Sequence, residues 1–157
     1  MILGINTASE KVSIALYGQK PETKKRKQES KFSQEIVWKS YRTQSKELLP
    51  KIDKFLKSCQ IRLKDLKAIA VFQGPGSYTG LRVGISIANA MAWALDIPVI
   101  GIKMKNQKSK NKNLDQKNKY SPIGALKIAQ KAEEILKVKK HKKFFEIVIP
   151  YYGSSLK

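Results

Sequence analysis

The sequence contains one cysteine and one histidine among 157 residues, and this scarcity excludes several kinds of site. A single cysteine cannot form an internal disulfide, which is typical of proteins from a reducing compartment. A zinc site needs several Cys or His ligands, so zinc binding is disfavoured. His141 stands between lysines, where an imidazole is solvated rather than oriented for nucleophilic catalysis. Cys59 follows Phe55 and Leu56, so we expect a buried, unreactive thiol.

Long apolar runs are also missing from the sequence. No segment approaches the roughly 20 apolar residues that a membrane helix needs. The amino terminus lacks the basic region and the apolar stretch of a signal peptide. We therefore expect a cytoplasmic protein without membrane contact, and the length is that of one domain.

Acidic residues are few, because 12 Asp and Glu stand against 32 Lys and Arg and the net charge is +20. Such a charge attracts polyanions and favours fast, salt-sensitive encounters with nucleic acid. However, Lys far outnumbers Arg and sits beside Asn, Gln and Ile, which is the mixture that codon bias places at solvated positions. Of the two explanations for the charge we favour solvated positions over specific RNA binding.

Hydrophobic periodicity predicts an α/β fold. The expected elements are strands at 2–6, 11–18 and 32–41, a helix at 45–59, a strand at 68–72, a helix at 81–95 and a strand at 98–102. The order βββαβα followed by one strand is that of the ribonuclease-H-like and actin-like fold. Residues 103–119 are rich in Lys and Asn and read as a linker, after which 122–138 resume helical spacing and 144–149 are apolar.

Two of the expected helices carry stripes that could bind a partner or cover the sheet. Leu48, Ile52 and Phe55 lie at helical spacing in the first helix, with Pro50 expected in its first turn. In the second helix, small residues recur at every fourth position and would allow close approach of another backbone. They are Gly80, Gly84, Ala88 and Ala92.

A glycine-rich loop, Gly74 to Gly80, joins the fourth strand to the second helix. A phosphate-binding P-loop needs a Lys after its last Gly, but Leu81 follows Gly80. The dinucleotide fingerprint needs Gly where Thr79 stands, and Pro75 removes a backbone donor. The helix amino terminus could still hold an anion. We favour a tight turn whose glycines relieve crowding.

Nucleotide hydrolysis in an actin-like protein needs carboxylates that hold the metal of the nucleotide. The first turn offers Asn6, which is neutral and binds a hard cation weakly. Glu10 and Glu35 are candidate carboxylates, although their spacing does not place them together. We therefore expect no metal and no cofactor.

Three segments resemble the TsaB family, also called YeaZ. Residues 2–9 resemble its opening strand and turn. Asn6 stands where the family usually has Asp, and Thr7 follows it. Residues 43–50 are similar too, with Gln44 where the family commonly has His. Residues 74–84 resemble the most recognisable signature. Its members here are Gly74, Pro75, Gly76, Ser77, Tyr78, Thr79, Gly80 and Arg82.

The resemblance covers residues 1–102 and implies an actin-like first lobe over that range. Members of the family continue into a second lobe. Here the linker at 103–119 leads to a helix and a tail, so the resemblance implies that 120–157 are the remnant of a truncated second lobe.

The resemblance implies a non-catalytic subunit of the system that makes N6-threonylcarbamoyladenosine at tRNA position 37. Its partner would be TsaD, which carries the catalysis, and TsaE, an ATPase, would join the pair. A homodimer is possible, and tRNA would be reached through the complex. Family members pair through helices of the first lobe, which implies contacts by Leu48, Ile52, Phe55 and the small-residue stripe. On this basis Ala88→Glu is expected to abolish pairing without unfolding the lobe.

Two other functions stay open. A degenerate actin-like nucleotide-binding enzyme would bind Mg-ATP with micromolar affinity. A basic RNA-binding protein would bind tRNA without a partner and with a steep salt dependence. We rank this last, because the Lys-rich loops lack the aromatic side chains that stack on bases.

Overall fold

The computed structural model describes residues 1–20, 31–104, 123–138 and 147–152. The strands are β1 (Ile2–Asn6), β2 (Lys11–Gln19), β3 (Lys31–Lys39), β4 (Ala68–Gly74) and β5 (Val99–Lys103). The helices are α1 (Gln44–Ser58), α2 (Tyr78–Leu95), α3 (Ala125–Val138) and the short 3₁₀ turn η1 (Leu63–Asp65).

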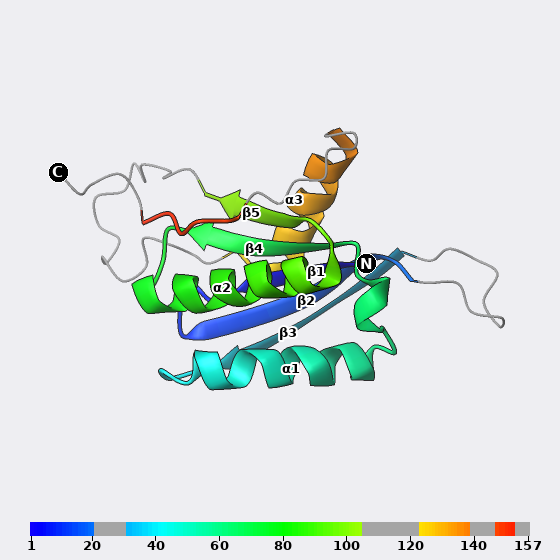
Figure 1. The fold of residues 1–157 in the computed structure, drawn as a ribbon. Helices are drawn as coiled ribbons and strands as arrows, with labels where there is room; N and C mark the ends of the chain where they lie inside the picture. Colours follow the sequence, from blue (N-terminus) through cyan, green and yellow to red (C-terminus); the bar gives the residue numbers. More distant parts are fainter. Residues whose placement is uncertain (21–30, 105–122, 139–146, 153–157) are drawn as a thin grey trace.

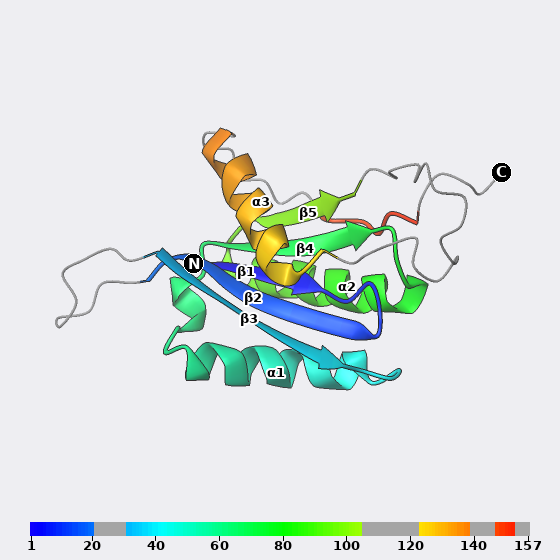
Figure 2. The ribbon, with the colours of Figure 1, turned by 180° about the vertical axis from the view of Figure 1, so that it is seen from behind.

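The strands form one mixed sheet in the order β3-β2-β1-β4-β5. β2 is antiparallel to both β1 and β3, whereas β4 is parallel to both β1 and β5. α1 and α2 lie side by side on one face of this sheet (Figure 1), and α3 crosses the opposite face (Figure 2). The predicted α/β order of the ribonuclease-H-like and actin-like fold is confirmed.

The core lies on both faces of the central strands. Every residue of β1 is buried, and β4 is buried except for Gln73, because helices cover both of its faces. This explains its continuous apolar run, which is typical of a strand within a parallel sheet. β3, at the sheet edge, is half exposed. Cys59 is buried as predicted, and its Sγ donates to Gln34 Oε1 at 3.1 Å.

Two helix starts differ from the sequence-based expectation. α1 begins at Gln44, so Pro50 stands in its second turn rather than in its first. Pro50 leaves the Lys46 carbonyl without a helical donor, and both residues are exposed to solvent, where water replaces that bond. α2 begins at Tyr78 rather than near Leu81, because the Ser77 Oγ accepts from Gly80 N at 3.3 Å and caps the helix.

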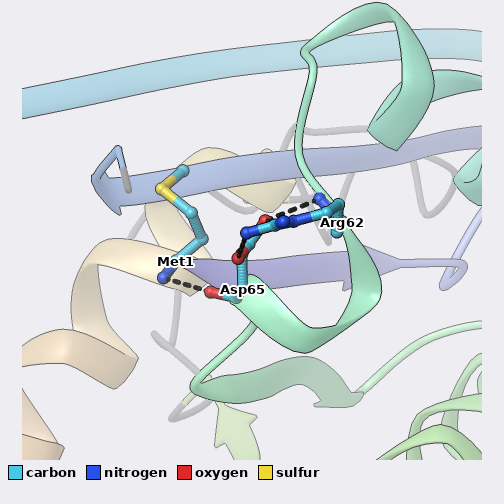
Figure 3. Close-up of polar contacts among 3 residues, drawn as sticks. All are labelled: Met1, Arg62 and Asp65. Carbon is cyan, nitrogen blue, oxygen red and sulfur yellow. Dashed lines mark hydrogen bonds and ion pairs between the residues drawn. The ribbon is translucent and has the colours of Figure 1, made fainter. Parts of the chain in front are cut away.

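The amino terminus is fastened to η1, which precedes β4 (Figure 3). The Met1 amino group donates to the carbonyl oxygen of Asp65 at 3.0 Å, and Lys67 N donates to Met1 O at 2.7 Å. The carboxylate of Asp65 accepts from Arg62 Nε and Nη2, each at 3.0 Å. Burial, and secondarily the charge of Lys67, lowers the pKa of the amino group below its ordinary 8.0. These bonds hold β1 and β4 together at the start of both strands.

α3 packs against β1, β2 and β4 of the same sheet that carries α1 and α2. Residues 105–122, which include most of the proposed linker and the proposed start of this helix at Pro122, lie outside the described residues. His141 lies outside them as well. The division into a first lobe, a linker and a remnant therefore stays a prediction.

Candidate functional site

The first turn and the glycine loop, which the sequence singled out separately, lie directly against each other. Thr7 is fully buried, and its Oγ1 donates to the carbonyl oxygen of Gly80 at 2.7 Å. Ser77 N donates to Ala8 O at 2.7 Å. Gln44 Nε2 donates to Ser9 O at 3.0 Å, so the amino end of α1 reaches the same turn. The three segments that carry the family resemblance thus form one cluster.

Glycine is needed at 80 and 84 because α2 touches the first turn there. A Cβ atom at Gly80 would overlap the Thr7 carbonyl oxygen, and one at Gly84 would overlap Thr7 Oγ1. At Gly76 a Cβ would approach the Ala8 Cβ to 2.5 Å. These contacts agree with the tight turn that we favoured over a phosphate loop, since the glycines admit protein atoms.

Gly74 meets a different neighbour. Its φ is +128°, and a Cβ there would overlap the carbonyl oxygen of Tyr151. Pro75 follows it through a cis peptide bond and is buried. The start of the loop therefore receives the segment 147–152, which comes from the far end of the chain.

Asn6 is 1% exposed and uses its side-chain amide on both sides. Nδ2 donates to Ile123 O at 2.6 Å, and Oδ1 accepts from Ala8 N at 2.9 Å. The amide thus fastens the first turn to the residues before α3. A carboxylate could not donate to the Ile123 carbonyl, so the neutral side chain fits this position.

The two candidate carboxylates do not converge. Glu10 is exposed, whereas Glu35 Oε1 accepts from Leu126 N at 3.3 Å at the start of α3. Ser13 Oγ accepts from Ala125 N at 3.0 Å, so strands β2 and β3 together cap this helix. In the part of the chain that the structure describes, no group of three His, Cys, Asp or Glu side chains is placed to hold a metal ion.

A cavity of about 260 Å³ lies between β5 and α3 rather than at the glycine loop. Its lining residues are Gly101, Ile102, Lys103, Lys131, Glu134 and Ile135.

The seven residues expected to bind a partner lie inside this chain. The small-residue stripe of α2 is buried on the chain's own sheet, and Leu48, Ile52 and Phe55 are at most 2% exposed. This placement agrees with the alternative that both stripes cover the sheet, and their contact with a partner stays a prediction. The expectation for Ala88→Glu is corrected, because Ala88 is fully buried and a glutamate there would disrupt the core.

The outer side of α2 presents other residues. Ala90, Ala94 and Trp93 are exposed, and Trp93 is 79% exposed. Within Tyr78–Leu95 only Arg82 is charged, although 28% of the chain is charged. Sequence reasoning left open whether the small-residue stripe meets a partner or covers the sheet, because this helix is apolar nearly all round.

The remaining signature residues form an exposed cluster that the sequence did not reveal. The Arg82 guanidinium lies 4.2 Å from the centre of the Tyr78 ring, which stacks on Tyr152 at 4.8 Å. Arg82 Nε donates to Tyr152 Oη at 3.2 Å. Thr79 is exposed beside them. Tyr152 is 70 residues from Arg82, so no local pattern could have found the pair.

The family described as "TsaD: tRNA N6-adenosine threonylcarbamoyltransferase" matches residues 38–148. "tRNA threonylcarbamoyladenosine biosynthesis protein TsaB" of Bacillus subtilis is 33% identical over 101 residues, covering 64% of this chain and 40% of that protein. The protein of the same name from Haemophilus influenzae is 36% identical over 101 residues, covering 64% and 38%. The chain therefore spans about two fifths of the length of these curated relatives.

Solved structures give the same picture. YeaZ from Pseudomonas aeruginosa superposes with a TM-score of 0.53 at 27% identity, covering 65% of this chain and 43% of that one. Thermus thermophilus RuvC has a TM-score of 0.53 at 11% identity, covering 90% and 98%, and this likeness shows the fold alone. Among the described residues, none of the helices has the length and apolar character to cross a membrane. The match to the TsaD family over more than half of the chain, together with these relatives, shows that the chain belongs to the TsaB/YeaZ family of actin-like proteins.

Proposed function

We propose that this chain takes part in the biosynthesis of N6-threonylcarbamoyladenosine in tRNA, as a non-catalytic subunit that pairs with TsaD. The names of its TsaB relatives support the pathway. The use of the signature residues supports a non-catalytic role, since Asn6, Thr7 and the loop glycines are engaged in internal packing.

One observation carries the pairing proposal, namely the low charge of the outer side of α2. On a chain with a net charge of +20, this exposed helix has a single charged residue at its amino end. Its middle and carboxyl half expose Ala90, Trp93 and Ala94. Small residues allow close approach of another helix, and an exposed Trp is a frequent anchor of protein interfaces. We name the surface formed by Ser86, Ala90, Trp93 and Ala94 the α2 outer face.

The partner that this face fits is an apolar helix pair, either of TsaD or of a second copy of this chain. A homodimer through the same face would compete with the heterodimer. TsaE and tRNA would join through the complex, as the resemblance implies.

The test is co-purification with TsaD from the same organism at moderate salt, which suppresses non-specific charge contacts. We expect the unchanged chain to form a stoichiometric complex and Ala90→Glu to lose it. Ala90 is exposed on a helix, so this variant keeps its fold. Val37→Glu is the matched control, because Val37 is an exposed apolar residue on β3 at 60% exposure.

The outcomes separate the parts of the proposal. Equal binding of TsaD by Ala90→Glu and Val37→Glu would show that the α2 outer face is not the pairing surface. No complex with the unchanged chain would overturn the pairing with TsaD. Calorimetry that finds micromolar Mg-ATP binding would instead favour the degenerate nucleotide-binding enzyme.

A further inference from the structure

The segment 147–152 lies at the carboxyl ends of β4 and β5, beside α2 (Figure 1, red). Backbone groups of Val148, Ile149 and Tyr151 make hydrogen bonds that hold it. Tyr151 N donates to Gln73 O at 2.7 Å, and Gln73 Nε2 donates to Ile149 O. No residue of the segment belongs to a strand or helix.

Asn89 of α2 bonds both backbone groups of one residue, Val148. Its Nδ2 donates to Val148 O at 3.0 Å, and its Oδ1 accepts from Val148 N at 3.1 Å. A side-chain amide that pairs with both groups of one residue reads an extended backbone in the way that a neighbouring strand does. Asn89 is half-buried, so its side-chain amide would lose two hydrogen-bond partners at a partly desolvated position if the segment left.

Two glycines shape the surface for close approach of a peptide. A Cβ atom at Gly101 would lie 2.9 Å from Val148 Cγ1, and one at Gly74 would overlap the Tyr151 carbonyl oxygen. Val148 is 8% exposed, whereas Ile147 and Ile149 are 75% and 67% exposed. The segment is therefore bound on one side only. At its end, the Tyr152 ring stacks on Tyr78 and its hydroxyl meets Arg82.

We propose that this surface is an exchangeable binding site for an extended peptide, filled by the chain's own residues 147–152 and open to the same segment of a second copy. We name it the tail site and define it by Gln73, Gly74, Tyr78, Arg82, Asn89 and Gly101. It selects a buried small apolar side chain, as at Val148, and an aromatic ring four positions later, as at Tyr152.

Exchange is favoured by the kind of contact that holds the segment. Among the side chains of the segment, only Val148 joins the core between the sheet and its helices. The other core residues lie outside the segment, so the segment can leave without unfolding them. A vacated tail site keeps polar groups that need partners, and a second copy supplies identical ones. Reciprocal exchange gives a twofold dimer, as in domain swapping. This inference is independent of pairing through the α2 outer face.

The first experiment uses the full chain with Val148→Asp and Tyr152→Ala, which vacates the tail site. We expect saturable binding of a fluorescein-labelled peptide with the sequence of residues 147–152 and two added lysines. The unchanged chain should bind it at least tenfold more weakly, because its own tethered segment competes. Adding Asn89→Leu to the vacated variant should reduce peptide binding by a similar factor. A peptide that carries Val148→Asp and Tyr152→Ala should also bind the vacated variant more weakly by a similar factor.

The second experiment mixes two full-length variants and measures mass by native mass spectrometry. The vacated variant keeps an open tail site, whereas Asn89→Leu keeps a competent segment but a weakened site. We expect a mixed dimer in excess of the dimers that either variant forms alone. Circular dichroism checks that both variants are folded. No mixed dimer and no saturable peptide binding would overturn the proposal.

A third measurement applies if the vacated variant fails to fold. Hydrogen exchange of the unchanged chain would compare the amides of Val148 and Tyr151 with that of Ala70 in β4. We expect the first two to exchange through local opening, faster than Ala70. Exchange of all three only through global unfolding would show that the segment is an integral part of the fold, and the inference would be wrong.

Discussion

At the scale of single residues, the family signature acts here as a packing device. Asn6 joins the first turn to Ile123, and Thr7 fills the space that Gly80 and Gly84 leave open on α2. Such contacts tolerate little change. Closely packed backbone atoms cannot shift enough to make room for a larger side chain, or to replace a lost hydrogen-bond donor.

Asn6→Asp should destabilise the chain by about 1–3 kcal/mol at neutral pH, because the buried Ile123 carbonyl loses its donor and faces a carboxylate. The loss should shrink as the pH falls and the new carboxyl group becomes protonated. Urea unfolding at several pH values measures this. Ser9→Ala is the control, since its hydroxyl bond to Lys11 O is exposed. A variant as stable as the unchanged chain would contradict the structural role of the amide.

Gly84→Ala and Gly80→Ala should each cost about 1–3 kcal/mol through overpacking. Only the first should be relieved by Thr7→Ala, because the new methyl at 84 meets the Thr7 hydroxyl, whereas the one at 80 meets the Thr7 carbonyl. Double-mutant cycles from denaturant unfolding measure the difference. Equal coupling of both glycines to Thr7→Ala would show that the contact is assigned incorrectly.

At the scale of elements, the ends of strands and helices are fastened by groups from distant segments. η1 holds the amino terminus of β1, and β2 and β3 cap α3 through Ser13 and Glu35. These bonds position whole helices and strands. Their loss should therefore destabilise the ends of those elements and leave the packing of the core unchanged.

The amino-terminal amine gives stability a pH dependence. Its pKa is below 8.0 in the folded state, so the unfolded state binds more protons between that lowered pKa and 8.0. Stability should therefore be greatest above pH 8.0 and fall as the pH decreases through this window. Unfolding midpoints between about pH 6 and 9 measure the effect. An Nα-acetylated chain, whose amino terminus cannot titrate, should lack this part of the pH dependence. Identical stability profiles of the acetylated and unchanged chains would contradict the assignment.

Removal of the α3 caps should loosen the first turn of that helix. Ser13→Ala should cost about 1 kcal/mol, because the Ala125 amide loses its acceptor in a buried position. Hydrogen exchange at Ala125 and Leu126 should rise more than exchange in α2. Glu134→Ala, an exposed change on the same helix, should leave both amides unaffected. Unchanged protection in Ser13→Ala would rule out the cap.

At the scale of the whole molecule, charge and apolar surface are separated. The chain carries +20, yet the outer side of α2 has one charge, and α1 beside it exposes several lysines. Two kinds of association should therefore differ in their response to salt.

Raising salt from about 50 to 200 mM should leave a complex through the α2 outer face largely intact, whereas RNA association should weaken by orders of magnitude. Pull-down of TsaD and filter binding of tRNA at both concentrations measure the two. If the affinity for TsaD falls with salt as steeply as the affinity for RNA, charge and not the α2 outer face holds the TsaD complex.

The sequence by itself determined the elements, their order and the fold class, because hydrophobic period and turn residues are local signals. It also indicated the tight glycine turn and the absence of a phosphate loop. Only the tertiary structure decided that the stripe from Gly80 to Ala92 faces inward, that Asn6 bonds Ile123, and that Tyr152 meets Tyr78 and Arg82. The physical reason is that these contacts join residues distant in the chain, and a periodic stripe has the same spacing whichever side of the helix meets the sheet.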